Sequence, residues 1–444
     1  MCNHTYSGGG GRPPGGLLLS CPNLNRLFFF FFCYLVSKHV FDRFDLYVLA
    51  RKIINPEPIF FDERTCADVR YDCGGALIAP GFIDVQINGG FGVDFSQDDD
   101  NIEAGLEIVA KGILAYGTTS FCPTLVTSSP EFYNKVIGKM KRTPGSAKGA
   151  EILGVHVEGP FINTNKKGAH DLKYIKKFDK VRNHKYPYWF TSIEEVYGPH
   201  WKNISMITLA PELENSPEVI KNLTDNGVTV SLGHSMGSLT DGEQAVRNGA
   251  SFITHLFNAM LPFHHRDPGL IGLLASSKIP ANKTVYYGII ADGIHTHPAA
   301  LRIAYKTHPA GLVLVSDAMG ALGLKPGIYK LGEQECDVKE TCAVIAGTNT
   351  LCGSIATMDK CVRHFKEATG CSLVEALEAA TLHPASSMGI ANRKGSLLFG
   401  CDADLVFLDK ELKVLSTWIA SEKVYQNPSA PELIPVRQNK VRLQ

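Results

Sequence analysis

The sequence has no excess of charge of either sign and no long hydrophobic run. Its 444 residues include 44 Lys and Arg against 44 Asp and Glu, so the formal net charge is +0. A strong field of one sign favours nucleic acid or an anionic membrane surface, and its absence argues against both partners. The apolar run 27–36 is shorter than the ~20 residues that a membrane-spanning helix needs. We therefore expect no nucleic-acid partner and no membrane association.

Paired cysteines are also absent. The 12 cysteines are scattered along the chain, and no two of them form a Cys-x-x-Cys pair. A disulfide framework or a cysteine-only zinc site is therefore not expected, and a reducing compartment such as the cytoplasm is favoured. Hydrophobic residues make up 44% of the chain, which is enough for a large core. The length fits a large barrel with a smaller second domain.

The first forty residues differ in composition from the rest. They contain glycine and proline repeats, and five consecutive phenylalanines at 28–32 form the centre of the apolar run. No small-residue cleavage site follows this run, as it would in a signal peptide. We interpret residues 1–40 as an atypical N-terminus that is dispensable for the active site, with a targeting segment as the alternative.

Both ends of the remaining chain are rich in predicted strands. Short apolar runs separated by proline and charged residues occupy 44–78, and similar runs recur at 395–425. Such runs are typical of short β-strands. We therefore expect one small β domain assembled from residues 41–77 and 395–444.

The middle of the chain repeats one theme, in which a short apolar run ends in polar residues and a helical stretch often follows. Eight runs show this pattern: 78–88, 118–126, 152–160, 207–212, 228–234, 252–258, 286–292 and 312–317. Nearly continuous apolar strands are what a parallel sheet buried on both faces requires. Eight of them alternating with helices predict an α/β fold, a (β/α)8 barrel over residues 78–394. The basic and aromatic segment 163–201 is expected to be a lid or insertion.

Ionisable side chains occur at the ends of four predicted strands. Glu158, His234, His255 and Asp317 each follow an apolar run. In a parallel barrel these ends meet at one mouth, where catalytic residues lie. One carboxylate and two imidazoles make a three-ligand set that leaves a position open for water, as in hydrolytic zinc sites. Each histidine alone is more often a core or surface histidine than a ligand, but four such residues together favour a metal centre.

Several motifs together resemble a known family. They are Ile-Ala-Pro-Gly-Phe-Ile-Asp-Val-Gln-Ile-Asn-Gly (78–89), His-Val-Glu-Gly-Pro-Phe (156–161), Lys-Lys-Gly-Ala-His (166–170), Gly-His-Ser (233–235), Thr-His-Leu-Phe-Asn-Ala-Met (254–260), His-His-Arg (264–266), Ala-Asp-Gly-Ile-His (291–295) and Ser-Asp-Ala (316–318). The chain resembles the N-acetylglucosamine-6-phosphate deacetylases of the amidohydrolase superfamily from about residue 78 to residue 404. The resemblance implies a metal-dependent barrel with a β-sandwich made from both chain ends.

The resemblance also implies site residues. The metal ligands would be Glu158, His234 and His255, and the catalytic residues Asp317 and His170. The implied substrate-binding residues are Ala169, Asn258, Ala259, Arg266, Asp292, Gly293, Ile294, His295, Leu351, Cys352 and Gly353. Many relatives in the superfamily have His-x-His on the first strand, but Gln86 and Asn88 stand there in this chain. Because amides are poor ligands beside imidazoles, one divalent metal per chain, zinc or a similar ion, is expected.

These residue types suit the implied reaction. Arg266 can hold phosphate oxygens through two parallel hydrogen bonds, and His295 can add a donor. His170 can donate a hydrogen bond to the developing oxyanion. Asp317 can accept a proton from a metal-activated water and deliver it to the departing amine. His156 is expected to be structural.

The expected function is removal of the acetyl group from N-acetyl-D-glucosamine 6-phosphate, which gives D-glucosamine 6-phosphate and acetate in amino-sugar catabolism. Two alternatives remain open: a cyclic-amide or nucleobase amidohydrolase, and a catalytically silent barrel that serves as a binding subunit. The first is disfavoured by Arg266 and His295, because those substrates carry no phosphate. We expect a phosphosugar as the small-molecule partner and a homodimer as the assembly.

Overall fold

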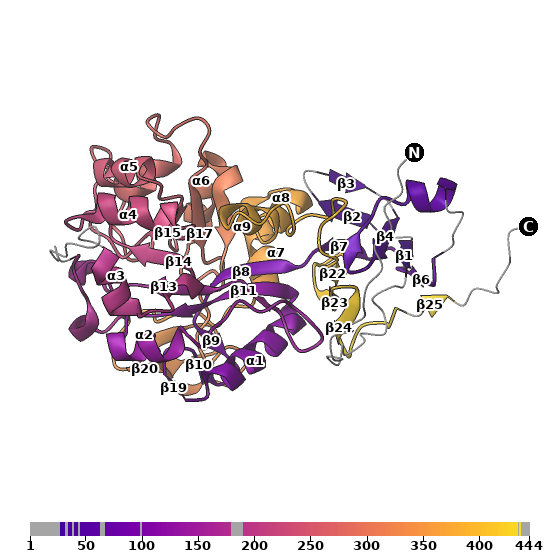
Figure 1. Ribbon diagram of the computed structural model, residues 1–444, viewed down its shortest axis with the longest axis horizontal. Helices are drawn as coiled ribbons and strands as arrows, with labels where there is room; N and C mark the ends of the chain where they lie inside the picture. The colour runs from indigo at the N-terminus through magenta and orange to yellow at the C-terminus, as the bar shows by residue number, and fades with distance from the viewer. Residues whose placement is uncertain are drawn as a thin grey trace, which may run out of the picture.

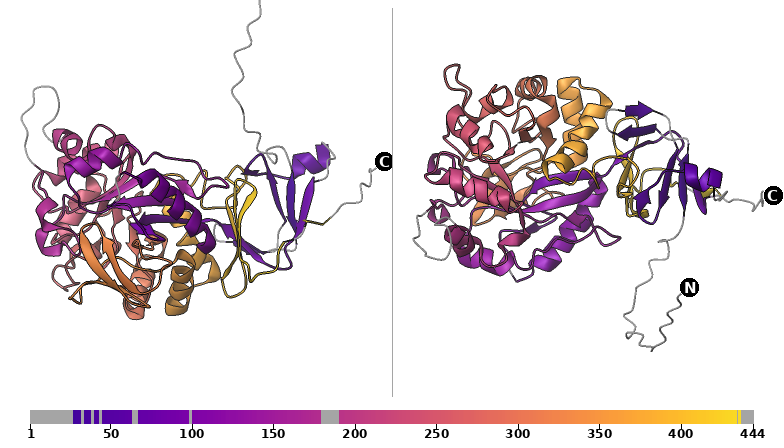
Figure 2. Two further views of the ribbon diagram at one scale, coloured as in Figure 1. Left: turned by 90° about the horizontal axis from the view of Figure 1, so that it is seen from below. Right: turned by 45° about the horizontal axis from the view of Figure 1, so that its top comes forward.

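The computed structural model describes residues 27–31, 34–37, 40–42, 45–62, 67–97, 100–178, 190–433 and 435–436. The molecule is elongated, with a barrel domain and a smaller β domain placed end to end (Figure 1). Both described chain ends lie in the smaller domain, and two further views agree on this arrangement (Figure 2). Within the described residues, no helix has the length and apolarity needed to cross a membrane.

Eight parallel strands form the barrel, as the eight apolar runs predict. They are β8 (Phe82–Ile87), β11 (Thr118–Leu125), β13 (Val155–Glu158), β14 (Ile204–Leu209), β15 (Thr229–Leu232), β16 (Phe252–Ile253), β17 (Tyr286–Ile289) and β18 (Leu312–Leu314). The last strand returns to the first through two hydrogen bonds, from the Asp317 N–H to the Gln86 carbonyl at 2.8 Å and from the Asn88 N–H to the Ala318 carbonyl at 2.7 Å. The expected (β/α)8 barrel is therefore confirmed.

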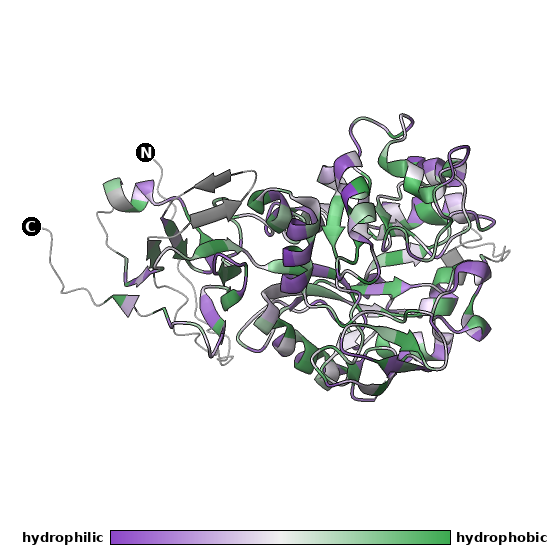
Figure 3. Cartoon of the chain, turned by 180° about the vertical axis from the view of Figure 1, so that it is seen from behind, coloured by the Kyte–Doolittle hydropathy of each residue, from purple (hydrophilic) through white to green (hydrophobic). Residues whose placement is uncertain are grey.

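Helices cover the outside of this barrel. They are α1 (Ile102–Gly112), α2 (Pro130–Val136), α3 (Phe190–Tyr197), α4 (Ser216–Asp225), α5 (Leu239–Arg247), α6 (Pro298–Thr307), α7 (Met358–Thr369), α8 (Leu373–Glu378) and α9 (Leu382–Ser387). In α4, Val219, Ile220 and Leu223 are buried, which is the spacing of one helical face turned to the strands. The start of α5 is fixed by a capping box between Ser238 and Asp241. The barrel strands and the helices both carry hydrophobic and hydrophilic residues (Figure 3).

The smaller domain is a sandwich of two sheets built from both chain ends. One sheet has the order β25 (Pro435–Val436), β6 (Val69–Asp72), β1 (Phe28–Phe31), β4 (Leu46–Leu49) and β5 (Lys52–Ile53). The other has the order β24 (Glu422–Gln426), β23 (Val414–Ile419), β22 (Leu405–Leu408), β7 (Leu77–Pro80), β2 (Tyr34–Ser37) and β3 (Val40–Asp42). Phe30, Phe407 and Trp418 meet in the core between the sheets, with the Phe30 and Trp418 rings edge to face at 5.3 Å.

The phenylalanine run corrects one sequence prediction. Residues 1–40 were expected to lie outside the β domain, but β1 is an inner strand that pairs with β4 on one side and β6 on the other. That these residues are dispensable for the active site stays a prediction. Side chains alternate along a strand, so Phe28 and Phe30 enter the sandwich core while Phe29 stacks on Tyr47 at 4.6 Å on the opposite face. The sandwich thus begins before residue 41. The glycine and proline repeats lie outside the described residues.

Two segments follow barrel strands on the side of the site. The predicted insertion 163–201 contains η3 (Thr164–Lys166), η4 (Leu172–Tyr174) and α3, and its part 179–189 lies outside the described residues. A three-stranded antiparallel sheet that the sequence did not predict, here called the flap, lies between β18 and α7. It consists of β19 (Gly327–Leu331), β20 (Gln334–Val338) and β21 (Ala343–Ile345). A small hairpin of β9 (Gly89–Gly90) and β10 (Val93–Asp94) follows β8.

Candidate metal centre and active site

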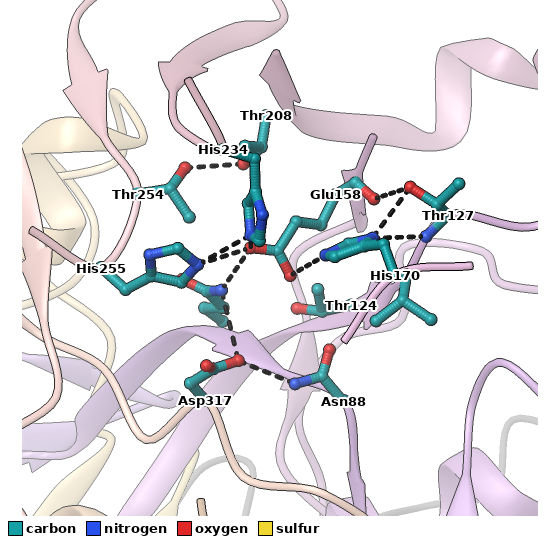
Figure 4. Close-up of polar contacts among 12 residues, drawn as sticks. Asn88, Thr124, Thr127, Glu158, His170, Thr208, His234, Thr254, His255 and Asp317 are labelled. Carbon is teal, nitrogen blue, oxygen red and sulfur yellow. Dashed lines mark hydrogen bonds and ion pairs between the residues drawn. The ribbon is translucent and has the colours of Figure 1, made fainter. Parts of the chain in front are cut away.

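The barrel brings the four predicted strand-end residues together. Glu158 is the last residue of β13, His234 and His255 each follow their strand by two residues, and Asp317 follows β18. All four side chains are buried. They converge at the C-terminal mouth of the barrel (Figure 4), where the eight strands direct their last side chains to one point.

Three of these residues place one atom each around a common point. His255 Nε2 lies 3.0 Å and His234 Nε2 3.2 Å from the same oxygen, Glu158 Oε1. The two imidazole nitrogens are 3.0 Å apart. Ligand atoms of a tetrahedral zinc site, at bonds of 2.0–2.1 Å, are separated by about 3.4 Å. The trio therefore fits a divalent metal ion with little rearrangement.

Hydrogen bonding sets the protonation of His234. Its Nδ1 lies 2.8 Å from the carbonyl oxygen of Lys166, which can only accept, so Nδ1 carries the proton. In the neutral ring the lone pair is then on Nε2, which faces Glu158 and His255. A ligand histidine commonly donates its other N–H to a carbonyl in this way. The arrangement prepares His234 to bind a metal.

His170 has the opposite tautomer. The Thr127 N–H donates to its Nδ1 at 3.1 Å, so the proton of the neutral ring is on Nε2. That nitrogen lies 3.8 Å from Glu158 Oε2, the carboxylate oxygen turned away from the two other histidines. Burial, the largest effect, lowers the pKa of His170 to about 3, which keeps the ring neutral. Glu158, His170 and His234 do bring ligand atoms within 4.8 Å of one another, but the protonated nitrogen makes His170 a donor rather than a ligand.

The two carboxylates of the site differ in their tendency to ionise. Burial raises the pKa of Glu158, but the adjacent imidazoles of His234 and His255 outweigh burial and hold the pKa well below its usual range. Burial and the neighbouring Glu158 charge raise the pKa of Asp317 to about 6. One carboxylate is therefore a stable anion, and the other can take up and release a proton near neutral pH.

Two amides of the first barrel strand hold Asp317 in place. The Asn88 side chain donates to Asp317 Oδ1 at 2.8 Å, and the Gln86 side chain donates to the same oxygen at 3.2 Å. The Gln86 amide also donates to Glu158 Oε1 at 3.0 Å. Gln86 thus bridges the two carboxylates as a donor, and Asn88 donates to Asp317. The sequence identified these positions but not these contacts.

His156 takes no part in the cluster. Its Nδ1 lies 3.1 Å from the Val85 carbonyl, and its Nε2 lies 2.8 Å from the Thr208 hydroxyl. Both ring nitrogens are thereby occupied inside the barrel. Burial, the largest effect, lowers the pKa of His156 to about 4. The structural role expected for His156 agrees with these contacts.

A cavity of about 280 Å³ opens beside the cluster. Of the residues that the resemblance implied for substrate binding, six line it: Ala169, Asn258, Ala259, His295, Leu351 and Gly353. His295 is oriented by Asp292, whose Oδ2 lies 2.6 Å from the His295 Nδ1. More than half of the predicted substrate-binding residues therefore line a single cavity.

Other predicted residues lie away from this cavity. Arg266 is exposed and is not among the lining residues, because its loop runs over the surface after β16. Cys352 is fully buried in the apolar cluster of the flap, whereas its neighbours Leu351 and Gly353 line the cavity. Gly293 and Ile294 are exposed and also do not line the cavity. For these residues the structure does not support direct contact within this cavity.

The sequence reasoning missed several lining residues. They include Asn165, Lys166, Val126, Leu331 and Thr350. Lys166 belongs to the Lys-Lys-Gly-Ala-His motif, so the motif could have indicated it. Leu331 and Thr350 come from the flap and its following loop, and no pattern in the sequence connects them to the barrel mouth.

Comparisons with known proteins agree with this geometry. The amidohydrolase family profile matches residues 77–430. An N-acetylglucosamine-6-phosphate deacetylase of Danio rerio is 56% identical over 394 residues, which cover 89% of this chain and 96% of that protein. The enzyme of the same name from Homo sapiens is 55% identical over 388 residues, covering 87% and 93%.

A solved structure is similar as well. The crystal structure of N-acetylglucosamine-6-phosphate deacetylase from Pasteurella multocida superimposes with a TM-score of 0.78 at 29% identity, covering 90% of this chain and 100% of that one. Sequence and structure therefore place the chain in the amidohydrolase family, among the N-acetylglucosamine-6-phosphate deacetylases.

Proposed function

We propose that the chain hydrolyses the acetamide of N-acetyl-D-glucosamine 6-phosphate to D-glucosamine 6-phosphate and acetate, as a step of amino-sugar catabolism. The observation that carries this proposal is the trio Glu158, His234 and His255 beside Asp317 in one cavity. The names of the relatives support the choice of substrate.

The amidohydrolase family is metal-dependent, and we infer that the trio holds one divalent ion, zinc by its mixed imidazole and carboxylate ligands. An ion bound there polarises the amide carbonyl and lowers the pKa of a bound water. Gln86 and Asn88 donate their amide hydrogens to the two carboxylates. Because amides are poor ligands beside imidazoles, these two residues argue for a single catalytic ion.

Asp317 is the proposed general base and acid. Its carboxylate takes a proton from the attacking water and returns it to the leaving nitrogen. A pKa of about 6 suits both transfers near neutral pH. The amide donors of Asn88 and Gln86 hold Oδ1, which leaves Oδ2 for the proton.

His170 is the proposed donor to the carbonyl oxygen. Thr127 fixes its Nδ1, so the Nε2–H faces the cavity from the side of Glu158 Oε2. A prepositioned donor of this kind stabilises the negative charge that develops on the oxygen.

The phosphate would be held at the cavity mouth. His295 lines the cavity and Lys166 adds a cation to its wall. The exposed Arg266 can contribute only if its loop closes or if a second copy of the chain presents it. We propose a homodimer, and we infer a cytoplasmic location, consistent with free cysteines throughout the described part of the chain.

The alternatives have less support. A cyclic amide or nucleobase carries no phosphate for His295 and Lys166 to bind. A silent binding subunit would not need a carboxylate poised to exchange a proton beside a complete ligand set.

The test is release of acetate and of the free amine from N-acetylglucosamine 6-phosphate by the purified chain. We expect turnover that a chelator abolishes and added zinc restores. The unphosphorylated sugar serves as the control and should be a much poorer substrate. Equal turnover of both sugars would reject the phosphosugar assignment.

A further inference from the structure

A second cavity of about 170 Å³ adjoins the site cavity. The two cavities share three lining residues, Val126, Ala169 and Leu331. All three are apolar and pack in one cluster with the flap. Beyond them, the second cavity is lined by hydroxyl groups such as those of Ser96 and Ser128. These three side chains, here called the partition, line both cavities.

The partition lies next to the proposed carbonyl donor. Val126 precedes Thr127, whose N–H and hydroxyl lie 3.1 Å and 2.8 Å from His170 Nδ1. Ala169 directly precedes His170 in the chain. Val126 and Ala169 are therefore chain neighbours of Thr127 and His170, and His170 is the proposed donor to the amide oxygen.

The proposed roles of His170 and Asp317 orient the reacting amide. His170 lies on the Oε2 side of Glu158 (Figure 4). Asp317 lies on the Oε1 side, where the Gln86 amide donates to both carboxylates. The leaving nitrogen must face Asp317 to receive its proton. The acyl chain is the third substituent of the trigonal carbonyl carbon and therefore faces another part of the cavity wall, which includes the partition.

The partition is also held firmly. The Val126 N–H donates to the Ser96 hydroxyl at 3.0 Å. The turn after Leu331 is fixed at Gly332, whose N–H donates to Asp94 at 2.6 Å and whose carbonyl accepts from Gln97 at 2.6 Å. A wall tied in this way does not yield easily to a longer acyl group, because packed interiors accommodate extra methylenes poorly.

Resting on the proposed function, we propose that Val126, Ala169 and Leu331 set the length of the acyl group that the enzyme removes. The partition accepts the methyl of an acetyl group and rejects longer acyl chains, although space for them exists behind it. Removing the Leu331 or Val126 side chain joins the two cavities and admits the longer chain.

The experiment compares kcat/KM for the N-formyl, N-acetyl, N-propanoyl and N-butanoyl derivatives of glucosamine 6-phosphate, with the free amine as readout. One methylene in an apolar pocket changes kcat/KM by roughly 10–200-fold. Wild type should therefore prefer acetyl to propanoyl by at least about tenfold, and Leu331→Ala should raise the propanoyl-to-acetyl ratio by about the same factor. Val126→Ala should change the ratio in the same direction.

The matched control is Val338→Ala. Val338 is buried in the same flap cluster but lines neither cavity, so this variant should keep the wild-type ratio. Leu331→Phe tests the opposite direction and should favour formyl over acetyl. It also covers the case in which the alanine variants fail to fold.

Three results would overturn the role proposed for the partition. The first is a wild type that accepts the propanoyl compound as well as the acetyl compound. The others are active Leu331→Ala and Val126→Ala variants with an unchanged propanoyl-to-acetyl ratio, or an equal change of that ratio in Val338→Ala. A wild type that releases amine from none of the four compounds would instead reject the proposed function, and this proposal with it.

Discussion

At the scale of single residues, the site is built on strained backbone. His234, His255 and Asp317 have φ values of +48°, +26° and +47°, a region that side chains other than glycine rarely adopt. Such residues persist only where the surroundings determine their conformation. The Asp317 N–H donates to the Gln86 carbonyl, and the Asp317 carbonyl accepts from Ser354, both at 2.8 Å. The backbone thus fixes the direction of the carboxylate before substrate binds.

Asp317→Asn should separate proton transfer from binding. An asparagine can still accept the Asn88 and Gln86 hydrogen bonds through its own oxygen, so the site should keep its shape. It cannot carry a proton, and general acid and base catalysis contributes roughly 10²–10⁴-fold. We expect turnover to fall by that order while the metal content is retained. Turnover near wild type with full metal content would remove Asp317 from this role, and lost metal would make it a ligand.

The variants His255→Asn and His170→Asn should distinguish a histidine that binds the metal from one that donates a hydrogen bond to the substrate. Loss of His255 removes a nitrogen that lies 3.0 Å from Glu158 Oε1, so the variant should lose metal. Loss of His170 removes a donor but no ligand, so metal should stay and turnover should fall by about 10²–10³-fold. The measurement is the metal-to-protein ratio after gel filtration, beside kcat. Full metal in the first variant, or empty protein in the second, would reverse the assignment made from the tautomers.

The sequence indicated much of this cluster because each of its residues ends a strand. Strand ends of a parallel barrel meet at one mouth, so Glu158, His234, His255 and Asp317 could be grouped without coordinates. Contacts made by loops could not be derived in the same way. The exposure of Arg266 depends on the path of its loop, which leaves no periodic pattern in the sequence.

At the scale of elements, the five phenylalanines demonstrate how local composition can mislead. An isolated apolar run predicts a strand, a buried helix and a signal-peptide core equally well. Long-range pairing decides among them here, because β1 joins β6, about forty residues later, in a parallel pair. The flap escaped prediction for a related reason: its strands are short and have exposed, polar positions that resemble a loop.

Phe30→Ala tests the structural role of β1. Phe30 is 1% exposed and packs against Trp418 and Tyr71 in the sandwich. Replacing a buried phenylalanine by alanine typically costs 3–5 kcal/mol of the free energy of unfolding. Phe61→Ala is the matched control, since Phe61 is 76% exposed and its loss should cost about 0.5 kcal/mol or less. Urea unfolding of both variants measures this difference. Equal free energies of unfolding for the two variants would show that β1 contributes little to the stability of the sandwich.

At the scale of the whole molecule, a partly buried ion cluster joins the two domains. It contains three cations and three anions: Lys52, Arg393, Lys394, Glu151, Asp402 and Asp404. Glu151 belongs to β12 (Glu151–Ile152) beside the barrel, whereas Lys52 belongs to the sandwich. Lys394 is 3% exposed and lies 3.0 Å from Glu151 and in contact with Asp404. The orientation of barrel and sandwich thus depends on matched charges as well as on apolar contact.

The pH dependence of this cluster follows from its pKa shifts. Burial raises the pKa of Glu151, but Arg393 and Lys394 outweigh burial and lower it. The pKa of Asp402 is lowered in the same way, with Lys52 as its nearest partner. A carboxyl whose pKa is lowered by folding stabilises the protein above its unfolded pKa of about 4. That stabilisation is lost as the pH falls through the folded pKa. The cluster should therefore contribute fully at neutral pH and progressively less below about pH 4.

Lys394→Met should expose this contribution. The variant leaves buried carboxylates without their central cation, a change that typically costs 3–5 kcal/mol. Lys221→Met is the matched control, because Lys221 pairs with Asp225 on the surface and such pairs contribute at most about 1 kcal/mol. Free energies of unfolding at pH 7, 5 and 3 measure the difference from wild type. Protonation of the carboxylates removes the unpaired charge, so the cost of Lys394→Met should shrink at pH 3. A cost that stays constant with pH would show that the side chain acts by packing alone, and the charge cluster would then not be what joins the two domains.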